Sequence, residues 1–405
     1  MTPLSSSPKY FFSLDVIRAI APLIVVLAHW QFFYYTNDFT LDSPLAKLHL
    51  PLYPYLAMLY ELSPLVVDLF FLLSGFIFFW FYSEKIASRE TSFGNFLLFR
   101  FTRLYPVHFM TLMVLVVLQP IMYYINGHYF IVHNNDTPHF LLHLFLIQTW
   151  GFEKTPALNG FNGPSWSASV EVLLYLIFFL LCWLKLHKNM LIIVGITLSA
   201  LVVQYMYPMI GQGIYSFFLG ALVYHIYHWA SQKSYLKIIT RVMIGLTILL
   251  WIFSISEYAF SFMRNGAMIL LQKFFPANEA ATNTRLFDII RNVFIRTLIN
   301  PGTLLMMALA ETTYGGLNIK WMMTLANSSL AMYLLHFPLM VFSVIVVDYF
   351  GISRNIFHSP FTLLSFYAVL IPSSLIIHHY IEVPVQQMLR KKGSKRARKP
   401  VAAAA

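Results

Sequence analysis

The chain has 405 residues, of which 59% are hydrophobic and 11% are charged, and its formal net charge is +11. A soluble globular chain is about half apolar and about a quarter charged, so this composition excludes the soluble class and indicates an integral membrane protein. The single cysteine, Cys182, excludes an intrachain disulfide framework and a cysteine-based metal cluster.

A helix needs about 20 mostly apolar residues to cross a bilayer. Ten stretches of the chain meet this requirement: 13–35, 63–83, 104–125, 166–184, 190–208, 213–229, 242–262, 294–311, 327–349 and 361–383. They predict an all-α, polytopic bundle of about ten transmembrane helices. In the eighth stretch, Pro301 and Gly302 predict a break or a kink. A further apolar run from Phe140 is too short to span, and we expect it to be re-entrant or to lie in the interface.

Both ends of the chain are expected in the cytoplasm. Arg18 interrupts the apolar core that a cleavable signal peptide would need, so we expect the first span to be retained. Ten spans then bring the C-terminus back to the same side, together with 19 of the 27 Lys and Arg residues. The exception is the segment 263–293, which carries four basic residues on the outer side.

We expect one transmembrane domain, residues 1–386, followed by a basic, disordered tail, residues 387–405. Seven Lys and Arg residues lie between positions 390 and 399. Such a run is typical of a topology signal and a lipid-headgroup anchor. No other feature supports nucleic-acid binding, so the expected partner of the tail is the bilayer.

Ionisable residues inside spanning helices are costly and usually functional. This chain has a short set of them: Asp15, Arg18, His29, Asp68, Glu171, His336 and Glu382. Eleven residues make three helical turns plus about 20°, so Arg18 and His29 share a face about 16 Å apart, and Asp15 lies on it too. Arginine binds phosphate or carboxylate, and neutral histidine is a general base near pH 7. The alternative is that Arg18 snorkels to headgroups and His29 makes one interhelical hydrogen bond.

Two arginines precede the third predicted span, in the stretch RFTRLYP. Arg100 and Arg103 share a helical face, and Pro106 suits the first turn of a helix. Two guanidinium groups beside a helix N-terminus form an anion site fit for a diphosphate, although such a pair alone is more often a topology signal. In the second span, Ser74 and Gly75 indicate close helix packing first, and close approach of backbone to a ligand second.

A buried glutamate follows a helix-start signal in the stretch NGPSWSASVEVLLYL. Pro164 and the serines after it are typical of a helix N-terminus. Glu171 enters the apolar run, with Tyr175 four positions later on the same face. A buried glutamate must be paired or protonated, so Glu171 is expected to pair with Arg18, to orient His29 or to bind a polar acceptor.

These features occur together in an order that resembles the acyltransferase-3 family of bacterial membrane acyltransferases, which acylate surface polysaccharides, O-antigen, peptidoglycan, exopolysaccharides and some macrolides. The matching segments run from residue 14 to residue 384: LDVIRAIAPLIVVLAH, FFLLSGF, RFTRLYP, WSASVEVLLY, YLLHFP and IEVP. Pro22 replaces the small or aliphatic residue usual in the first segment, and it predicts a kink between Arg18 and His29.

The resemblance implies a protein of the bacterial cytoplasmic (inner) membrane, with acyl-CoA as cytoplasmic donor and a carbohydrate hydroxyl as acceptor. His29 is then the catalytic base, and Arg18, Arg100 and Arg103 are donor-binding residues. From the sequence itself we also expect Glu171 to take part in catalysis and Ser74 to contact the donor. The expected substrate-binding residues are Asp15, Trp166, Tyr175 and His336. No permanently bound cofactor and no metal is expected.

Two mechanisms and two classes of protein stay open at this point. The acyl group passes to the acceptor directly, with His29 as base, or through an acyl-histidine. The rival class is a proton-coupled transporter or flippase, in which Arg18, Glu171 and His336 form a pathway. Transporters often show internal repeats, and none is evident in this sequence.

Overall fold

The computed structural model describes residues 8, 10–34, 44–131, 134–152, 160–276, 280–316 and 318–397. Over these ranges the chain forms helices and no strands, which confirms the predicted all-α class. Nine helical stretches among the described residues are long and apolar enough to cross a membrane. They are α1 (Phe12–Trp30), α2 (Tyr53–Ala87), α3 (Phe93–Asn126), α5 (Trp166–Trp183), α7 (Pro208–Ser231), α8 (Leu236–Phe260), α10 with α11 (Ala280–Phe294 and Asn300–Tyr314), α13 (Ser329–Tyr349), and α14 with α15 (Pro360–Ile377 and Val383–Ala397).

The fifth predicted span is the helix α6 (Met190–Met206), which packs along α7 and has 17 residues. It is apolar but shorter than the other nine. The connecting segments contain the short helices α4 (Thr137–Leu144), α9 (Phe262–Phe274) and α12 (Lys320–Asn327), the 3₁₀ turns η1 (Gln31–Tyr34), η2 (Pro44–His49), η3 (Gly163–Ser165) and η5 (Arg354–His358), and the π turns η4 (Ile295–Ile299) and η6 (His378–Glu382). The apolar run from Phe140 falls in the short helix α4 and the turns after it, so it does not form a span.

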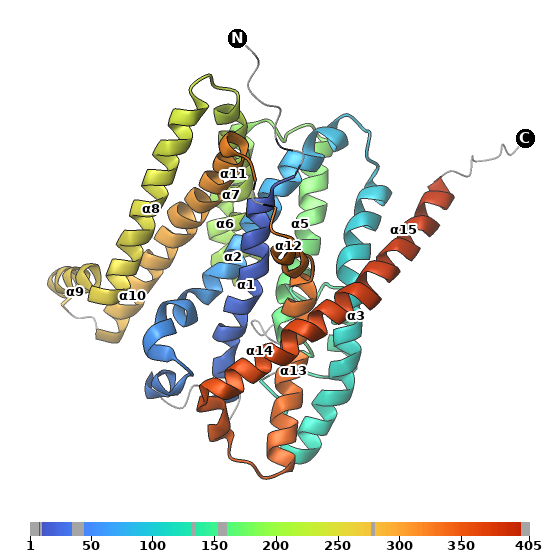
Figure 1. Cartoon of the computed structure of the whole chain (residues 1–405), viewed down its shortest axis with the longest axis vertical. Coiled ribbons are helices and arrows are strands. Elements are labelled where there is room, and N and C mark those ends of the chain that lie inside the picture. Colours follow the sequence, from blue (N-terminus) through green and yellow to red (C-terminus); the bar gives the residue numbers. More distant parts are fainter. Residues whose placement is uncertain are drawn as a thin grey trace, which may run out of the picture.

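The helix α1 lies in the middle of the bundle (Figure 1). The helices α8, α10 and α11 lie to one side of it, and α3 and α15 lie to the other. α1 begins, and α15 ends, toward the same end of the molecule, which we call the N-terminal end. This arrangement agrees with the expectation that both chain ends share one side of the membrane.

Two glycines allow α2 and α7 to cross closely. A Cβ atom on Gly75 of α2 would lie 1.9 Å from the carbonyl oxygen of Phe217, and one on Gly220 of α7 would lie 2.0 Å from that of Leu72. Only glycine permits backbones to approach this far. The packing interpretation of the Ser74–Gly75 pair is therefore correct for Gly75.

The α3 helix begins earlier than its hydropathy predicts. It starts at Phe93, where the Ser92 hydroxyl accepts a hydrogen bond from the Asn95 backbone at 3.3 Å. Its 34 residues rise about 51 Å, far more than the bilayer core. The expectation that Arg100 and Arg103 lie beside a helix N-terminus is therefore wrong, and Pro106 lies in the helix interior, because hydropathy locates the apolar part of a helix and not its first turn.

Two prolines are accommodated by π turns. The predicted break at Pro301 does not occur, because the helix continues from α10 through the π turn η4 into α11. Pro384 follows the π turn η6 in the same way. A proline ring clashes with the carbonyl four residues earlier, and in both places that carbonyl belongs to the wider π turn. The α1 helix likewise runs unbroken through Pro22.

The helix α15 extends into the basic segment, as far as Ala397. Its Arg390 side chain lies over the Phe99 ring of α3, 5.0 Å from the centroid, and its Nε atom donates to the Thr102 hydroxyl at 3.3 Å. These contacts join the first part of the predicted tail to α3.

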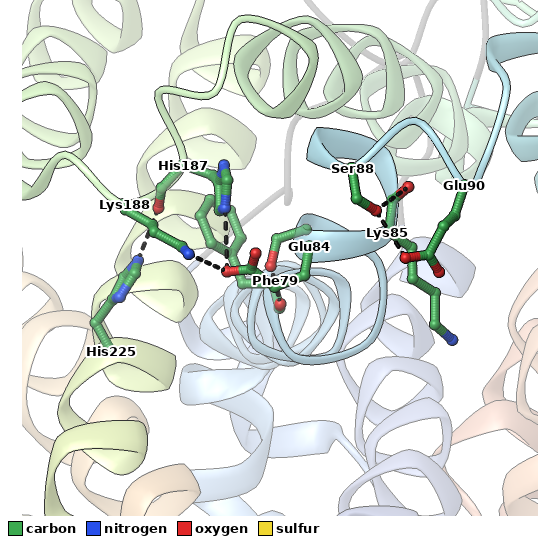
Figure 2. Close-up of polar contacts among 9 residues, drawn as sticks. Phe79, Glu84, Lys85, Ser88, Glu90, His187, Lys188 and His225 are labelled. Carbon is green, nitrogen blue, oxygen red and sulfur yellow. Dashed lines mark hydrogen bonds and ion pairs between the residues drawn. The ribbon is translucent and has the colours of Figure 1, made fainter.

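A polar cluster ties α2 to its neighbours near the N-terminal end (Figure 2). The Glu84 carboxylate lies 2.8 Å from Nζ of Lys188 and 3.3 Å from Nε2 of His187. His225 of α7 donates to the backbone carbonyl of His187 at 3.0 Å. These contacts fasten the turn between α5 and α6 to both α2 and α7.

Candidate active site

A cavity of about 150 Å³ lies between α1, α2, α3, α5 and α13. Six of the predicted site residues line it: Arg18, Ser74, Arg100, Arg103, Glu171 and Tyr175. They come from four helices and from positions as far apart as 18 and 175. The fold therefore gathers six of the ten predicted site residues in one place.

Arg18 reaches the cavity from α1 with a carboxylate behind it. Its Nη1 atom donates to Asp15 at 2.8 Å, one helical turn earlier. Asp15 is 1% exposed and accepts a second hydrogen bond from the hydroxyl of Tyr10 at 2.5 Å. Burial, followed by the contact with Asp15, raises the pKa of Tyr10 to about 12. Asp15 does not line the cavity, so the structure brings it to Arg18 rather than to the expected substrate position.

The second pair of cations comes from α3. The Arg100 guanidinium lies over the rings of Phe78 and Tyr82, at 4.4 and 4.5 Å from their centroids, and its buried Nε atom has no hydrogen-bond partner. Arg103 lies one turn further along the same helix. Neither arginine forms an ion pair with a carboxylate of the described residues. Both charges therefore remain available to an anionic ligand.

Glu171 is hydrogen-bonded within the cavity. The hydroxyl of Tyr175 donates to its Oε1 atom at 2.7 Å, which is the same-face contact that the spacing predicts. Within the described residues, Glu171 makes no hydrogen bond or ion pair with Arg18 or with His29, the two residues that it was expected to pair with or to orient. Glu171 lines the same cavity as the three arginines.

The two predicted histidines meet each other outside the cavity lining. The Nδ1 atom of His29 lies 2.7 Å from the Nε2 atom of His336, so the two rings meet edge to edge, with centroids 5.0 Å apart and planes 18° from parallel. The ring of Phe32 stacks on His29 with centroids 4.7 Å apart. The Nδ1 atom of His336 contacts the backbone carbonyl of Tyr333. His336 is 0% exposed, whereas His29 is partly exposed.

Tyr333 connects the cavity to the histidine pair, and sequence reasoning missed it. Its ring lines the cavity, and the ring of His336 lies 5.8 Å away, one helical turn further on. Its hydroxyl accepts from Ser167 at 2.9 Å and donates to the Pro164 carbonyl at 2.8 Å. The signal was present, because Tyr333 lies in the segment YLLHFP and Ser167 in WSASVEVLLY.

Three other predicted residues lie away from the cavity. Trp166 packs on Phe71 with ring centroids 6.0 Å apart and does not line the cavity. Asp68 forms a buried ion pair with Arg296, at 3.0 Å, and accepts from the Ser216 hydroxyl at 2.6 Å. Glu382 pairs with His378 at 2.8 Å inside the π turn η6. Within the described part of the chain, no three His, Cys, Asp or Glu side chains come together as a metal site requires.

Fold and site together define a multi-pass helical membrane protein with a cationic cavity between its helices, beside a histidine pair. The acyltransferase-3 family model, described as an acyltransferase domain, matches residues 11–379. The chain therefore belongs to the acyltransferase-3 family.

Two relatives match shorter parts of the chain. The acyltransferase MdmB of Streptomyces mycarofaciens is 32% identical over 128 residues, which is 32% of this chain and 30% of the relative. A protein named protein 2 in the picA locus of Rhizobium radiobacter is 35% identical over 107 residues, or 26% of this chain and 44% of the relative. The matches thus span less than half of either relative. No solved structure matches the chain.

Proposed function

We propose that this protein transfers an acyl group, in the first instance acetyl, from acyl-CoA to a hydroxyl group of a cell-surface or exported glycan. Membership of the acyltransferase-3 family supports the reaction class, and the printed name of the Streptomyces relative agrees with it. The observation that carries the proposal is the convergence of Arg18, Arg100 and Arg103 on one cavity. One wall of that cavity, Tyr333, contacts the histidine pair.

The arginines bind the phosphates of the donor, which is a co-substrate and not a resident cofactor. Guanidinium groups bind phosphate oxygens in pairs through planar, charge-assisted hydrogen bonds. The cavity lining contains three arginines against one carboxylate, Glu171, so its charge attracts an anion. The N-terminal end of the bundle then faces the cytoplasmic side of a bacterial inner membrane, which is the orientation that the distribution of basic residues favours.

His29 removes the proton of the acceptor hydroxyl. The acceptor oxygen forms a bond to the thioester carbonyl carbon, and the carbon–sulfur bond then breaks. His29 returns the proton to the leaving thiolate, so that CoA leaves as a thiol. General base catalysis of this kind contributes about 10²–10⁴-fold to a rate. Glu171 and Tyr175 hold the polar groups of the substrate in the cavity.

The experiment measures thiol release from acetyl-CoA by purified protein in nanodiscs, with and without a glycan extract. We expect release that depends on the extract, and a KM for acetyl-CoA that rises about tenfold or more in Arg103→Gln, because a charge-assisted hydrogen bond contributes about 1.5–3 kcal/mol. Arg241→Gln is the matched control, because Arg241 is exposed on α8, a helix that contributes no residue to the cavity lining. Solute uptake by proteoliposomes without any thiol release would identify a transporter instead.

A further inference from the structure

The contacts of the two histidines determine which of their nitrogen atoms carry protons. A backbone carbonyl oxygen only accepts hydrogen bonds, so the Nδ1 atom of His336, in contact with the Tyr333 carbonyl, must carry its proton. A neutral imidazole has one donor and one acceptor nitrogen. The Nε2 atom of His336 is therefore an acceptor.

The protonation of His29 follows from that of His336. Its Nδ1 atom lies 2.7 Å from the Nε2 acceptor of His336, so in the neutral pair it must carry the proton and donate. The lone pair of His29 is then on Nε2. We propose that His336 is a positioning residue, which holds His29 in the tautomer whose Nε2 atom is free to accept a proton.

The surroundings of the rings support this division of roles. His336 is fully buried and both of its ring nitrogens are engaged, whereas His29 is partly exposed and, among the described residues, only its Nδ1 atom has a partner. Phe32 stacks on His29 at 4.7 Å and holds the ring plane. His29 is thus the ring that meets substrate, and His336 acts through it. This inference rests on the proposed function, in which His29 is the base.

The proposal also accounts for proton movement in the reaction. When the Nε2 atom of His29 takes the hydroxyl proton, its Nδ1–H still donates to His336, and the new positive charge is stabilised by that hydrogen bond. The proton then leaves Nε2 for the thiolate, and the pair returns to its starting tautomers. A carboxylate is not required at the second position, because the Tyr333 carbonyl fixes the orientation of His336.

Three variants separate positioning from a purely structural role. His336→Leu removes the acceptor, and we expect kcat to fall about 10²–10⁴-fold while KM for acetyl-CoA stays unchanged. His336→Gln restores a side-chain acceptor and is expected to recover part of kcat. His108→Leu is the matched control, because His108 is also 0% exposed and bonded to a backbone carbonyl, at 2.8 Å, but does not contact His29. Its kcat should stay close to that of the unaltered protein.

Nitrogen NMR of protein labelled with ¹⁵N-histidine tests the tautomer without any activity. The His29 signals, identified by their loss in His29→Asn, are expected to show a protonated Nδ1 and an unprotonated Nε2 in the unaltered protein. An unprotonated Nδ1 there, or an unchanged kcat in His336→Leu, would overturn the inference. Full activity in His29→Ala would instead overturn the proposed function. The NMR measurement would still decide the tautomer of His29, because it does not depend on activity.

Discussion

The hydroxyl of Tyr333 accepts a hydrogen bond from Ser167 at 2.9 Å, although 166 positions separate the two residues in the chain. The same hydroxyl donates to the carbonyl of Pro164. The start of α5 is thereby joined to α13, which carries His336. The Tyr333 ring is held as a wall between the cationic cavity and the histidine pair.

Removing this hydroxyl should loosen that wall. Tyr333→Phe keeps the ring but leaves the buried Pro164 carbonyl with only the longer hydrogen bond from the Ser167 hydroxyl, at 3.4 Å, and we expect a loss of about 1–3 kcal/mol of unfolding free energy. Ser167→Ala leaves the Tyr333–Pro164 bond in place and should cost about 0.5–1.5 kcal/mol. Thermal unfolding of the two variants in the same detergent compares them. Equal stability losses would mean that the Pro164 contact contributes nothing.

Asp15 is expected to control the donor site through Arg18. Asp15→Asn removes the carboxylate that fixes the Arg18 guanidinium, so the affinity for CoA should fall about tenfold, as for the loss of a charge-assisted contact. Arg18→Lys keeps the charge but loses the planar fork, and it should weaken binding as well. Calorimetric titration with CoA measures both. Undiminished affinity in Asp15→Asn would show that Arg18 needs no support from it.

The crossing of α2 and α7 should not tolerate a methyl group. Gly75→Ala and Gly220→Ala each place a Cβ atom about 2 Å from a carbonyl oxygen, and overpacking of this kind costs about 1–3 kcal/mol or more. The controls are Gly195→Ala and Gly245→Ala, where a Cβ meets nothing within 4 Å. Because alanine has a higher helix propensity than glycine, these control variants should keep or slightly raise the stability of the protein. Equal stability of all four variants would contradict the close crossing.

The buried pair of Asp68 and Arg296 should behave as one unit. Replacing either partner alone leaves the other charge buried and unpaired, at a cost of about 3–5 kcal/mol. The double variant Asp68→Leu/Arg296→Met removes both charges and should recover most of that loss. A double-mutant cycle of unfolding free energies measures the coupling. Strictly additive losses would mean that the two side chains do not depend on each other.

Most of the fold and much of the cavity could be predicted from the sequence. The physical reason is not the same for the two. Apolar stretches identify spanning helices because the bilayer imposes length and hydropathy, but they do not mark where α3 begins, since its first turns lie outside that constraint. The contact of Glu171 with Tyr175 follows from helical spacing. The meeting of His29 with His336 does not, because it depends on how α1 and α13 pack, 307 positions apart.

Two residues that were expected to bind the substrate do not line the cavity. Asp15 and Trp166 were expected to bind the substrate, and in the structure Asp15 bonds to Arg18 and Trp166 packs on Phe71. Periodicity reports which residues share a face and not what that face meets. Tyr333 was missed for the same reason, since a tyrosine in an apolar helix has no polar signal as clear as that of a charge.

The most direct test of the central claim is acyl transfer to the cell-surface glycan in a strain that carries His29→Ala at normal protein level. Mass analysis of the glycan, against strains with the unaltered protein and without it, measures the transfer. The account predicts that the His29→Ala strain resembles the strain without the protein, with transfer lowered at least about 10²-fold. Acylation equal to that of the unaltered strain would contradict it.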